Sequence, residues 1–155
     1  MKKLLLSECH FHDSIIDNIS FEQGKLVISF GEERYYHAYS NADIILSCAD
    51  DIGECTFTWY RCHFSRNTKE ILYDGKIISY EMLQEFFALG GTFLQNEFLY
   101  SPDKPHLIQL QCDVQDKPKK KCALYEKYSA DYSLIIQLYC FDDFLWIRET
   151  SKSFD

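Results

Sequence analysis

Proline and glycine, the residues that most often separate folded units, are scarce in this chain. Only three prolines and six glycines occur among 155 residues, and the chain contains neither a Gly/Ser-rich linker nor an internal repeat. The best candidate connection, residues 101–105, holds two of the prolines and is too short to link two domains. We therefore expect one domain over residues 1–155, a usual length for a single hydrophobic core.

Long apolar runs are missing as well. Residues 1–6 imitate the start of a signal peptide, but the apolar run ends at Ser7, short of the roughly 7–15 residues of such a region. No stretch approaches the ~20 apolar residues of a membrane span. The seven cysteines are an odd number without closely spaced pairs, which favours reduced thiols. We expect a soluble, cytoplasmic protein without a membrane partner.

Basic residues are the minority charge. The chain has 16 Lys and Arg against 24 Asp and Glu, which leaves a net charge of −8. Binding to nucleic acid needs clustered basic residues, and the one dense run, Lys117–Lys121, contains Pro118 and fits a solvated turn. We therefore expect no nucleic-acid partner. An acidic balance favours a basic protein partner instead, because opposite charge steers association.

The sequence also lacks the short motifs that accompany common enzyme chemistries. It has no G-x-S-x-G, no P-loop, no G-x-G-x-x-G and no H-E-x-x-H, and no cysteine lies in a nucleophile signature. These absences lower the weight of an enzymatic function without removing it, since many sites lie outside motifs. They predict no catalytic residue, no cofactor and no bound metal.

Strand patterns dominate what is present. The 12 Phe and 11 Tyr suit pleated, half-buried surfaces, and apolar residues alternate with polar ones over 106–114 and 134–140. The second of these runs and 144–149 are predicted to form a hairpin. With 121–128 between the two runs, residues 106–149 predict a four-stranded meander. A further hairpin is predicted from 42–48 and 54–64.

The opening hairpin is the strongest local signal. Two apolar-rich runs flank the glycine-bearing turn Glu22–Lys25. A three-residue loop with Gly24 in the left-handed region would mix apolar and polar residues on both faces. A four-residue loop pairs Phe21 with Leu26, and burial favours it because a slip of one residue exchanges every face. This register predicts one apolar face, made of Ile15, Ile19, Phe21, Leu26, Ile28 and Phe30.

One segment, residues 79–90, has helical spacing. Its apolar residues recur so that one face of about three turns is hydrophobic. Ser79 is a suitable N-cap, Glu81 places a negative charge in the first turn, and Gly90 can end the helix in the left-handed region. We predict an α+β, mostly β domain: an antiparallel meander or curled sheet of about eight strands, packed on this one main helix.

Two residue groups are candidate sites. In an extended Cys9–Asp13, His10 and His12 would share a face, as a metal site on a strand requires. Two more ligands would have to come from elsewhere, with His37 and His63 as candidates, and no pattern in the sequence links them to this site. The plainer interpretation is that Asp13 turns the chain and His12 bonds to backbone or carboxylate. The second group is the aromatic segment 35–39, because tyrosines are enriched at interfaces. The alternative is that its members are alternately core and rim residues of a strand. The candidate binding residues are His12, Asp13, Tyr35, Tyr36, His37 and Tyr39.

The run His12-Asp13-Ser14-Ile15-Ile16, followed by a strand, a glycine turn and Lys25–Phe30, resembles the opening of several small bacterial β-rich families. Some members have been assigned as immunity proteins of polymorphic toxin systems. The resemblance covers residues 11–30 only. It implies an antiparallel fold and a non-enzymatic, protein-binding role, and no site residues carry over.

Three functions follow as hypotheses. The first is a protein-binding, immunity-like module with a basic partner such as a toxin domain; the same surface features also fit a homodimer. The second is a small metal-dependent enzyme that uses His10 and His12. The third is a β domain that binds a small molecule.

Overall fold

The computed structural model describes residues 1–31, 41–47, 55–124 and 133–149, with the backbone alone at 62–64 and 71–74. The elements described in full are ten strands, one α-helix and one 3-10 turn, and residues 123 and 124 are also helical. In chain order these are β1 (Lys2–Leu5), the 3-10 turn (Leu6–Glu8), β2 (Ile15–Glu22), β3 (Lys25–Phe30), β4 (Ala42–Ser47), β5 (Thr56–Ser65), β6 (Glu70–Ile78), α1 (Tyr80–Ala88), β7 (Thr92–Tyr100), β8 (His106–Asp116), β9 (Ser133–Cys140) and β10 (Phe144–Glu149).

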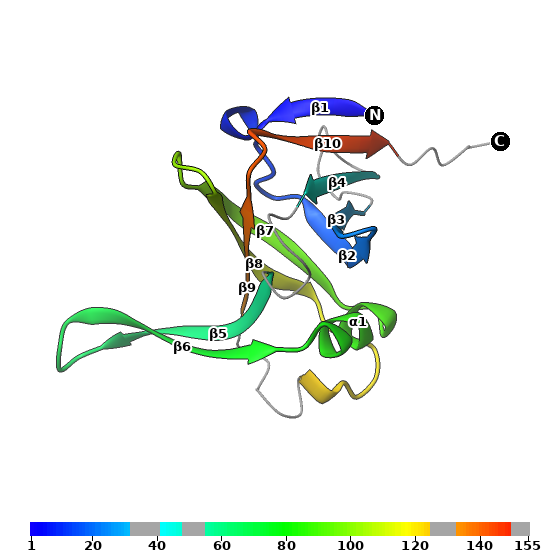
Figure 1. Cartoon of the computed structure of the whole chain (residues 1–155). Coiled ribbons are helices and arrows are strands. Elements are labelled where there is room, and N and C mark those ends of the chain that lie inside the picture. Colours follow the sequence, from blue (N-terminus) through cyan, green and yellow to red (C-terminus); the bar gives the residue numbers. More distant parts are fainter. Residues whose placement is uncertain (32–40, 48–54, 125–132, 150–155) are drawn as a thin grey trace.

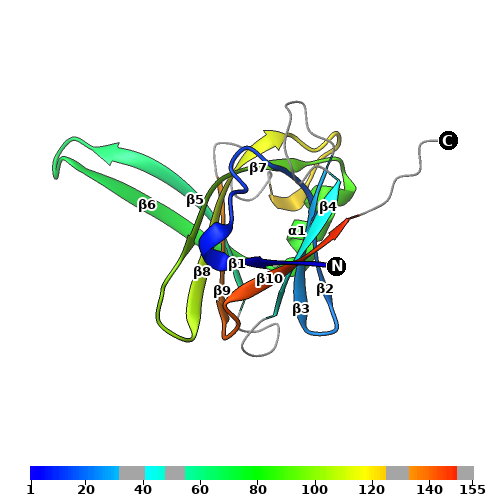
Figure 2. The ribbon, with the colours of Figure 1, turned by 90° about the horizontal axis from the view of Figure 1, so that it is seen from above.

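All described strands belong to one antiparallel sheet, in the order β1-β10-β4-β3-β2-β7-β8-β9-β5-β6. The sheet is strongly curled, with β2, β3 and β4 on one side and β5, β8 and β9 on the other (Figure 2). The hairpin of β5 and β6 reaches outward beyond the rest of the molecule (Figure 1). The predicted fold class, an α+β and mostly β domain with antiparallel strands and one main helix, is confirmed.

The core lies inside the curl, where aromatic side chains from three elements meet. Phe86 of α1 stacks on Phe93 of β7 with ring centroids 4.5 Å apart, and Trp59 of β5 contacts both rings edge-on. All three side chains are fully buried. Gly91 makes this packing possible, because a Cβ there would lie 2.6 Å from the Phe86 ring. The helix therefore packs against the inner face of the curled sheet, where the core lies.

The predicted helix is present with both predicted caps. The hydroxyl of Ser79 accepts a hydrogen bond of 3.2 Å from the backbone N–H of Met82. At the other end Gly90 has a φ of +93°, and the N–H groups of Gly90 and Gly91 donate to the carbonyls of Phe87 and Phe86. This is the Schellman arrangement, which satisfies the last carbonyls of the helix.

The register of the opening hairpin is as predicted, but its loop has two residues rather than the predicted four. Ile19 faces Ile28, and Phe21 faces Leu26. Glu22 and Lys25 are paired as well, so only Gln23 and Gly24 form the turn, with φ values of +52° and +76°. Positive φ at both central residues is the type I′ geometry, whose twist matches that of the two strands.

The apolar face of this hairpin needs one correction. A β-bulge between Ile16 and Asn18 shifts the alternation of β2, so Ile16 rather than Ile15 joins Ile19 and Phe30 in the core. Ile15 is buried outside the core cluster, in register with Leu94 of β7. The sequence pattern contains no signal for the extra residue of a bulge.

Two predicted hairpins are wrong. β4 pairs with β3 and β10, whereas β5 pairs with β6 and β9, so residues 42–48 and 54–64 are not hairpin partners. β9 and β10 are not partners either, because β10 lies between β1 and β4. Residues 141–143 link β9 to β10. The backbone N–H of Leu6 donates a hydrogen bond to the carbonyl of Asp143 in this link.

The predicted meander is likewise corrected. β8 pairs directly with β9, and residues 121–124, the described part of the predicted strand at 121–128, are not a strand. Cys122 and Leu124 still point into the core. Two long strands in this fold, β6 and β7, and the short β1 were not predicted. In the part of the chain that the structure describes, no helix is both long and apolar enough to cross a membrane.

Candidate functional site

The predicted pair His12 and Asp13 forms an exposed corner where the chain enters β2. Asp13 has a φ of +67°, and its backbone N–H donates to the Gln95 carbonyl at 2.8 Å. His12 Nδ1 lies 2.6 Å from the Asn96 carbonyl oxygen, and its Nε2 lies 3.4 Å from an Asp13 carboxylate oxygen. Both side chains are more than half exposed. The left-handed turn at Asp13 therefore holds both residues against β7.

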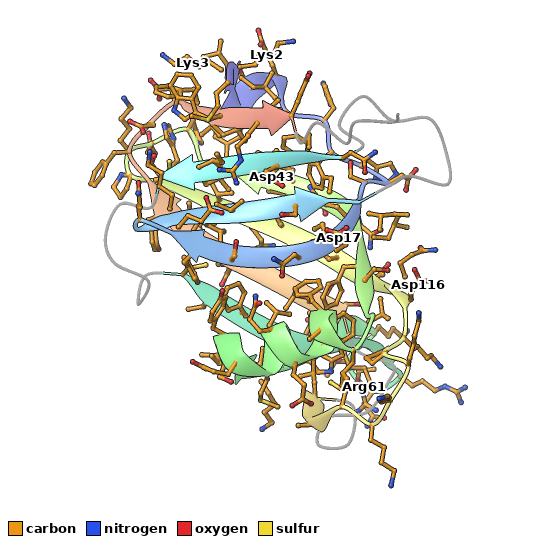
Figure 3. The ribbon with its side chains drawn as sticks, turned by 90° about the vertical axis from the view of Figure 1, so that its right-hand side faces the viewer. Lys2, Lys3, Asp17, Asp43, Arg61 and Asp116 are labelled. Carbon is orange, nitrogen blue, oxygen red and sulfur yellow. The ribbon has the colours of Figure 1, made fainter. Side chains whose placement is uncertain are left out.

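Carboxylates gather around this corner. β7 has a bulge at Asn96, whose side-chain amide donates to Asp113 of β8, and the Ser133 hydroxyl donates to the same carboxylate at 2.6 Å. Bulges re-aim side chains and often occur at functional sites. We name five exposed or half-exposed carboxylates of β2, β7, β8 and the turn before β2 the acidic surface: Asp13, Asp17, Glu97, Asp113 and Asp116. Glu22, at the far end of β2, belongs to the cleft described below. Figure 3 shows Asp17 and Asp116 on the side that faces the viewer.

The corner does not contain the ligand set of a metal site among the described residues. No group of three or more His, Cys, Asp and Glu side chains there could hold a metal ion. The two ring nitrogens of His12 face a backbone carbonyl and the neighbouring carboxylate. A metal-dependent reaction at His10 and His12 therefore gains no support from the described geometry.

A second feature is a cleft of about 620 Å³ on the outer face of β3, β4 and β10. The Arg148 guanidinium joins two carboxylates there, donating to Asp43 at 2.8 and 3.1 Å and to Glu22 at 3.1 and 3.3 Å. These hydrogen bonds, first to Glu22 and then to Asp43, raise the pKa of Arg148 above its usual value. The cleft is lined by Met1, Glu22, Gln23, Lys25, Val27, Ile45, Trp146 and Arg148.

The residues of this cleft are not among the candidate residues predicted from the sequence. Phe144, Trp146 and Arg148 alternate with the buried Leu145 and Ile147, so a period-two pattern could have placed them on the outer face of one strand. It could not have shown that Glu22 and Asp43, more than a hundred residues earlier, face the same guanidinium.

A third cluster surrounds His106, a buried residue at the start of β8. Its Nδ1 lies 2.8 Å from the Ser101 carbonyl, and its Nε2 lies 2.8 Å from the Asp143 carboxylate. Ser7 lines the same small cavity of about 240 Å³. A serine nucleophile needs a ring nitrogen to accept its proton, and both nitrogens of His106 already have partners. The cluster therefore ties loops together rather than activating Ser7.

Two of the described cysteines, Cys9 and Cys112, are poor nucleophiles. Burial, reinforced by the charge of Glu8, raises the pKa of the Cys9 thiol to about 12. Burial likewise raises the pKa of Cys112, which lies fully inside the core. Because the thiolate is the reactive form, neither side chain is suited to covalent chemistry near neutral pH.

The other candidate binding residues, Tyr35, Tyr36, His37 and Tyr39, lie outside the described residues. Comparisons with protein-family models, with curated proteins and with solved structures found no match. The function is therefore argued from the described geometry.

Proposed function

We propose that this chain is a non-enzymatic protein-binding module that takes a basic partner on the acidic surface. The observation that carries the proposal is the meeting of two bulged strands, β2 and β7, beside the left-handed turn at Asp13. Exposed or half-exposed carboxylates of β2, β7 and β8 lie around this meeting point. The described chemistry favours binding over catalysis, since the His12 nitrogens have partners and burial raises the pKa of the Cys9 and Cys112 thiols.

The site is partly organised before any partner arrives. Asp113 is oriented by hydrogen bonds from Asn96 and Ser133, and Asp116 accepts a hydrogen bond of 3.0 Å from Thr92. Fixed carboxylates lose less conformational entropy on binding than freely rotating ones. Exposed ion pairs contribute only about 0.2–1 kcal/mol each, so a complex needs several of them, as the acidic surface provides. Such a surface mainly increases the association rate and the selectivity for basic proteins.

The specific form of the proposal is immunity-like. A module that covers a basic toxin domain needs a rigid surface of opposite charge more than it needs a deep pocket. The net charge of −8 supports this form, as does the resemblance of residues 11–30.

The test is affinity capture with the full chain, using a charge reversal on the acidic surface and a matched reversal elsewhere. Glu97→Lys changes an exposed carboxylate beside the β7 bulge, and Glu81→Lys makes the same change at an exposed position of α1. We expect a basic protein to be captured by the wild type and by Glu81→Lys and to be lost with Glu97→Lys. Capture should also weaken as salt rises, because exposed charges are screened.

Two results would contradict the proposal. One is capture of the same partner by all three chains. The other is a partner with an acidic surface. Inhibition of the activity of a captured toxin domain by the wild type, and not by Glu97→Lys, would support the immunity-like form.

The cleft beside Trp146 favours a second candidate function, the binding of a small apolar or aromatic ligand. It combines an indole and an apolar floor of Val27 and Ile45 with a charged rim, as small-molecule sites do. Trp59 is buried, so a ligand in the cleft should change the fluorescence of Trp146 alone. Loss of the response in Trp146→Phe would place the ligand in the cleft, and a response that persists in Trp146→Phe would place it elsewhere.

A further inference from the structure

The two ends of the sheet differ in how they resist pairing with another strand. β1, at one end, has only four residues, and two of them are Lys2 and Lys3. Short edges and edge lysines are common protections against pairing. β6, at the other end of the described sheet, has nine residues, a single lysine and no proline. Its Ile77 is 73% exposed. Among the described strands, β6 is therefore the edge that is open to a further strand.

Half of β6 also lies in a part of the sheet that has only two strands. β5 pairs with β9 only from Thr56 to Tyr60, but it pairs with β6 as far as Ser65. The outer half of the β5–β6 hairpin thus extends past the sheet as a two-stranded arm (Figure 1). A two-stranded hairpin alone is marginally stable in water, so a third strand on β6 would stabilise the arm.

The sequence of β6 is complementary to itself in one antiparallel register. Like charges that face each other across a strand pair are unfavourable. In a symmetric pair of β6 strands, one residue lies on the two-fold axis and faces its own copy. An axis through Asp74 or through Lys76 therefore places two like charges opposite each other. An axis through Gly75 places Asp74 opposite Lys76 of the second copy, and it places Ile77 opposite Tyr73.

Strand geometry allows this register. The backbone N–H and C=O groups of a strand point alternately to its two sides, so a strand can pair with itself only where facing positions are an even number of residues apart. Asp74 and Lys76 meet this condition. Gly75, on the axis, has no side chain to keep the two backbones apart. A register centred on Tyr73 also pairs Glu70 with Lys76, but it leaves the exposed Ile77 opposite Lys69.

We infer that β6 is a self-association edge, through which two copies of this chain form a dimer with Gly75 on the two-fold axis. The dimer continues the sheet from one copy into the other. It places the exposed Ile77 of each copy opposite Tyr73 of the other. The pairing uses a different surface from the acidic surface, so a dimer leaves that surface open to a basic partner.

The experiment is sedimentation velocity on the full chain with reversed charges on β6. The wild type should form a dimer as its concentration rises. Asp74→Lys creates two Lys–Lys contacts in this register, and Lys76→Asp creates two Asp–Asp contacts. Each variant alone should therefore stay monomeric, whereas an equimolar mixture should dimerise because every contact between the two variants joins a lysine to an aspartate.

Controls separate this pairing from a change within one chain. Asp74 is opposite Arg61 inside the arm, so Asp74→Lys also weakens the hairpin of its own chain. Mixing does not repair that contact, and restored dimerisation therefore reports the contact between copies. Lys2→Asp reverses a charge on the other edge and should leave the dimer unchanged. Circular dichroism confirms that each variant is folded.

Three results would overturn the inference. The first is a wild type that stays monomeric up to about 1 mM. The second is dimerisation of either β6 variant alone to the same extent as the wild type. The third is a mixture of folded variants that does not dimerise. If Asp74→Lys does not fold, the double variant Asp74→Lys/Lys76→Asp replaces the mixture, and this chain must dimerise for the inference to stand.

Discussion

The imidazole of His106 and the carboxylate of Asp143 are joined at 2.8 Å, across 37 residues of sequence. The same carboxylate lies 3.2 Å from Lys104 Nζ. His106 is buried and Asp143 is exposed, so the pair anchors the link between β9 and β10 to the start of β8. The hydrogen bond from His106, and then the one from Lys104, hold the pKa of Asp143 below its ordinary value of 3.8.

This pair predicts an acid-dependent loss of stability. A carboxylate with a lowered folded-state pKa stabilises the fold at pH values above its unfolded pKa, and the contribution is lost as pH falls through the folded pKa. We expect Asp143→Asn to lower the melting temperature at neutral pH and to reduce its dependence on pH below about 4. Thermal melts between about pH 2 and pH 7 measure this. Asp103→Asn, an exposed change in the same region, is the control, and an equal effect of both variants would contradict the prediction.

The packing around Gly91 predicts a steric effect. A Cβ at this position would lie 2.6 Å from the Phe86 ring, which is stacked in the core. We expect Gly91→Ala to lower the free energy of unfolding by about 1–3 kcal/mol. Urea denaturation measures the change. Gly24→Asn is a suitable comparison because that turn has open space and asparagine accepts a positive φ, so its cost should stay below about 0.5 kcal/mol.

Substitutions of Arg148 and of its partner Glu22 should lower the free energy of unfolding by different amounts. Arg148→Ala leaves Asp43 buried without its charged partner, and we expect a loss of about 1–3 kcal/mol. Glu22 is half exposed, so Glu22→Gln should cost at most about 1 kcal/mol. Arg148→Lys keeps the charge but cannot donate to both carboxylates in the same geometry, and it should fall between these two. Equal losses for Arg148→Ala and Glu22→Gln would show that burial of Asp43 is unimportant.

Gln95 predicts a stabilising substitution. Its side chain is fully buried, and its amide nitrogen and oxygen have no hydrogen-bond partner among the described residues. Burying an unsatisfied amide costs free energy, which an apolar side chain of similar shape avoids. We expect Gln95→Met to raise the free energy of unfolding by about 1–2 kcal/mol. Gln109→Met loses a hydrogen bond of 2.8 Å with Gln137 and should instead lower it. A clear destabilisation by Gln95→Met would refute the prediction.

Local features of the fold were predictable because neighbouring residues determine them. The hairpin register follows from which pairing buries Ile19 and Phe21 together, and the structure has that register. The helix follows from its apolar spacing and from the capping chemistry of Ser79 and Gly90. The exception is the bulge in β2, whose extra residue leaves no mark on the alternation.

The candidate site was predictable only in part. The density of polar groups around His12 and Asp13 identified the corner, and the structure places both residues beside the β7 bulge. Their neighbour Asp113 lies a hundred residues further on, and Arg148 is 126 residues from Glu22. Such groups belong to different strands, and their proximity depends on a strand order that alternation does not encode.

By itself, the sequence determined the strand-rich class, the one helix with its caps and the first hairpin, because each of these depends on contacts within about twenty residues. Only the tertiary structure decided that β10 lies between β1 and β4, that β9 lies beside β5, and that β6 ends the sheet. Any amphipathic strand can pair with any other of matching pattern. The choice is made by how the whole curled sheet buries Trp59, Phe86 and Phe93 in one core.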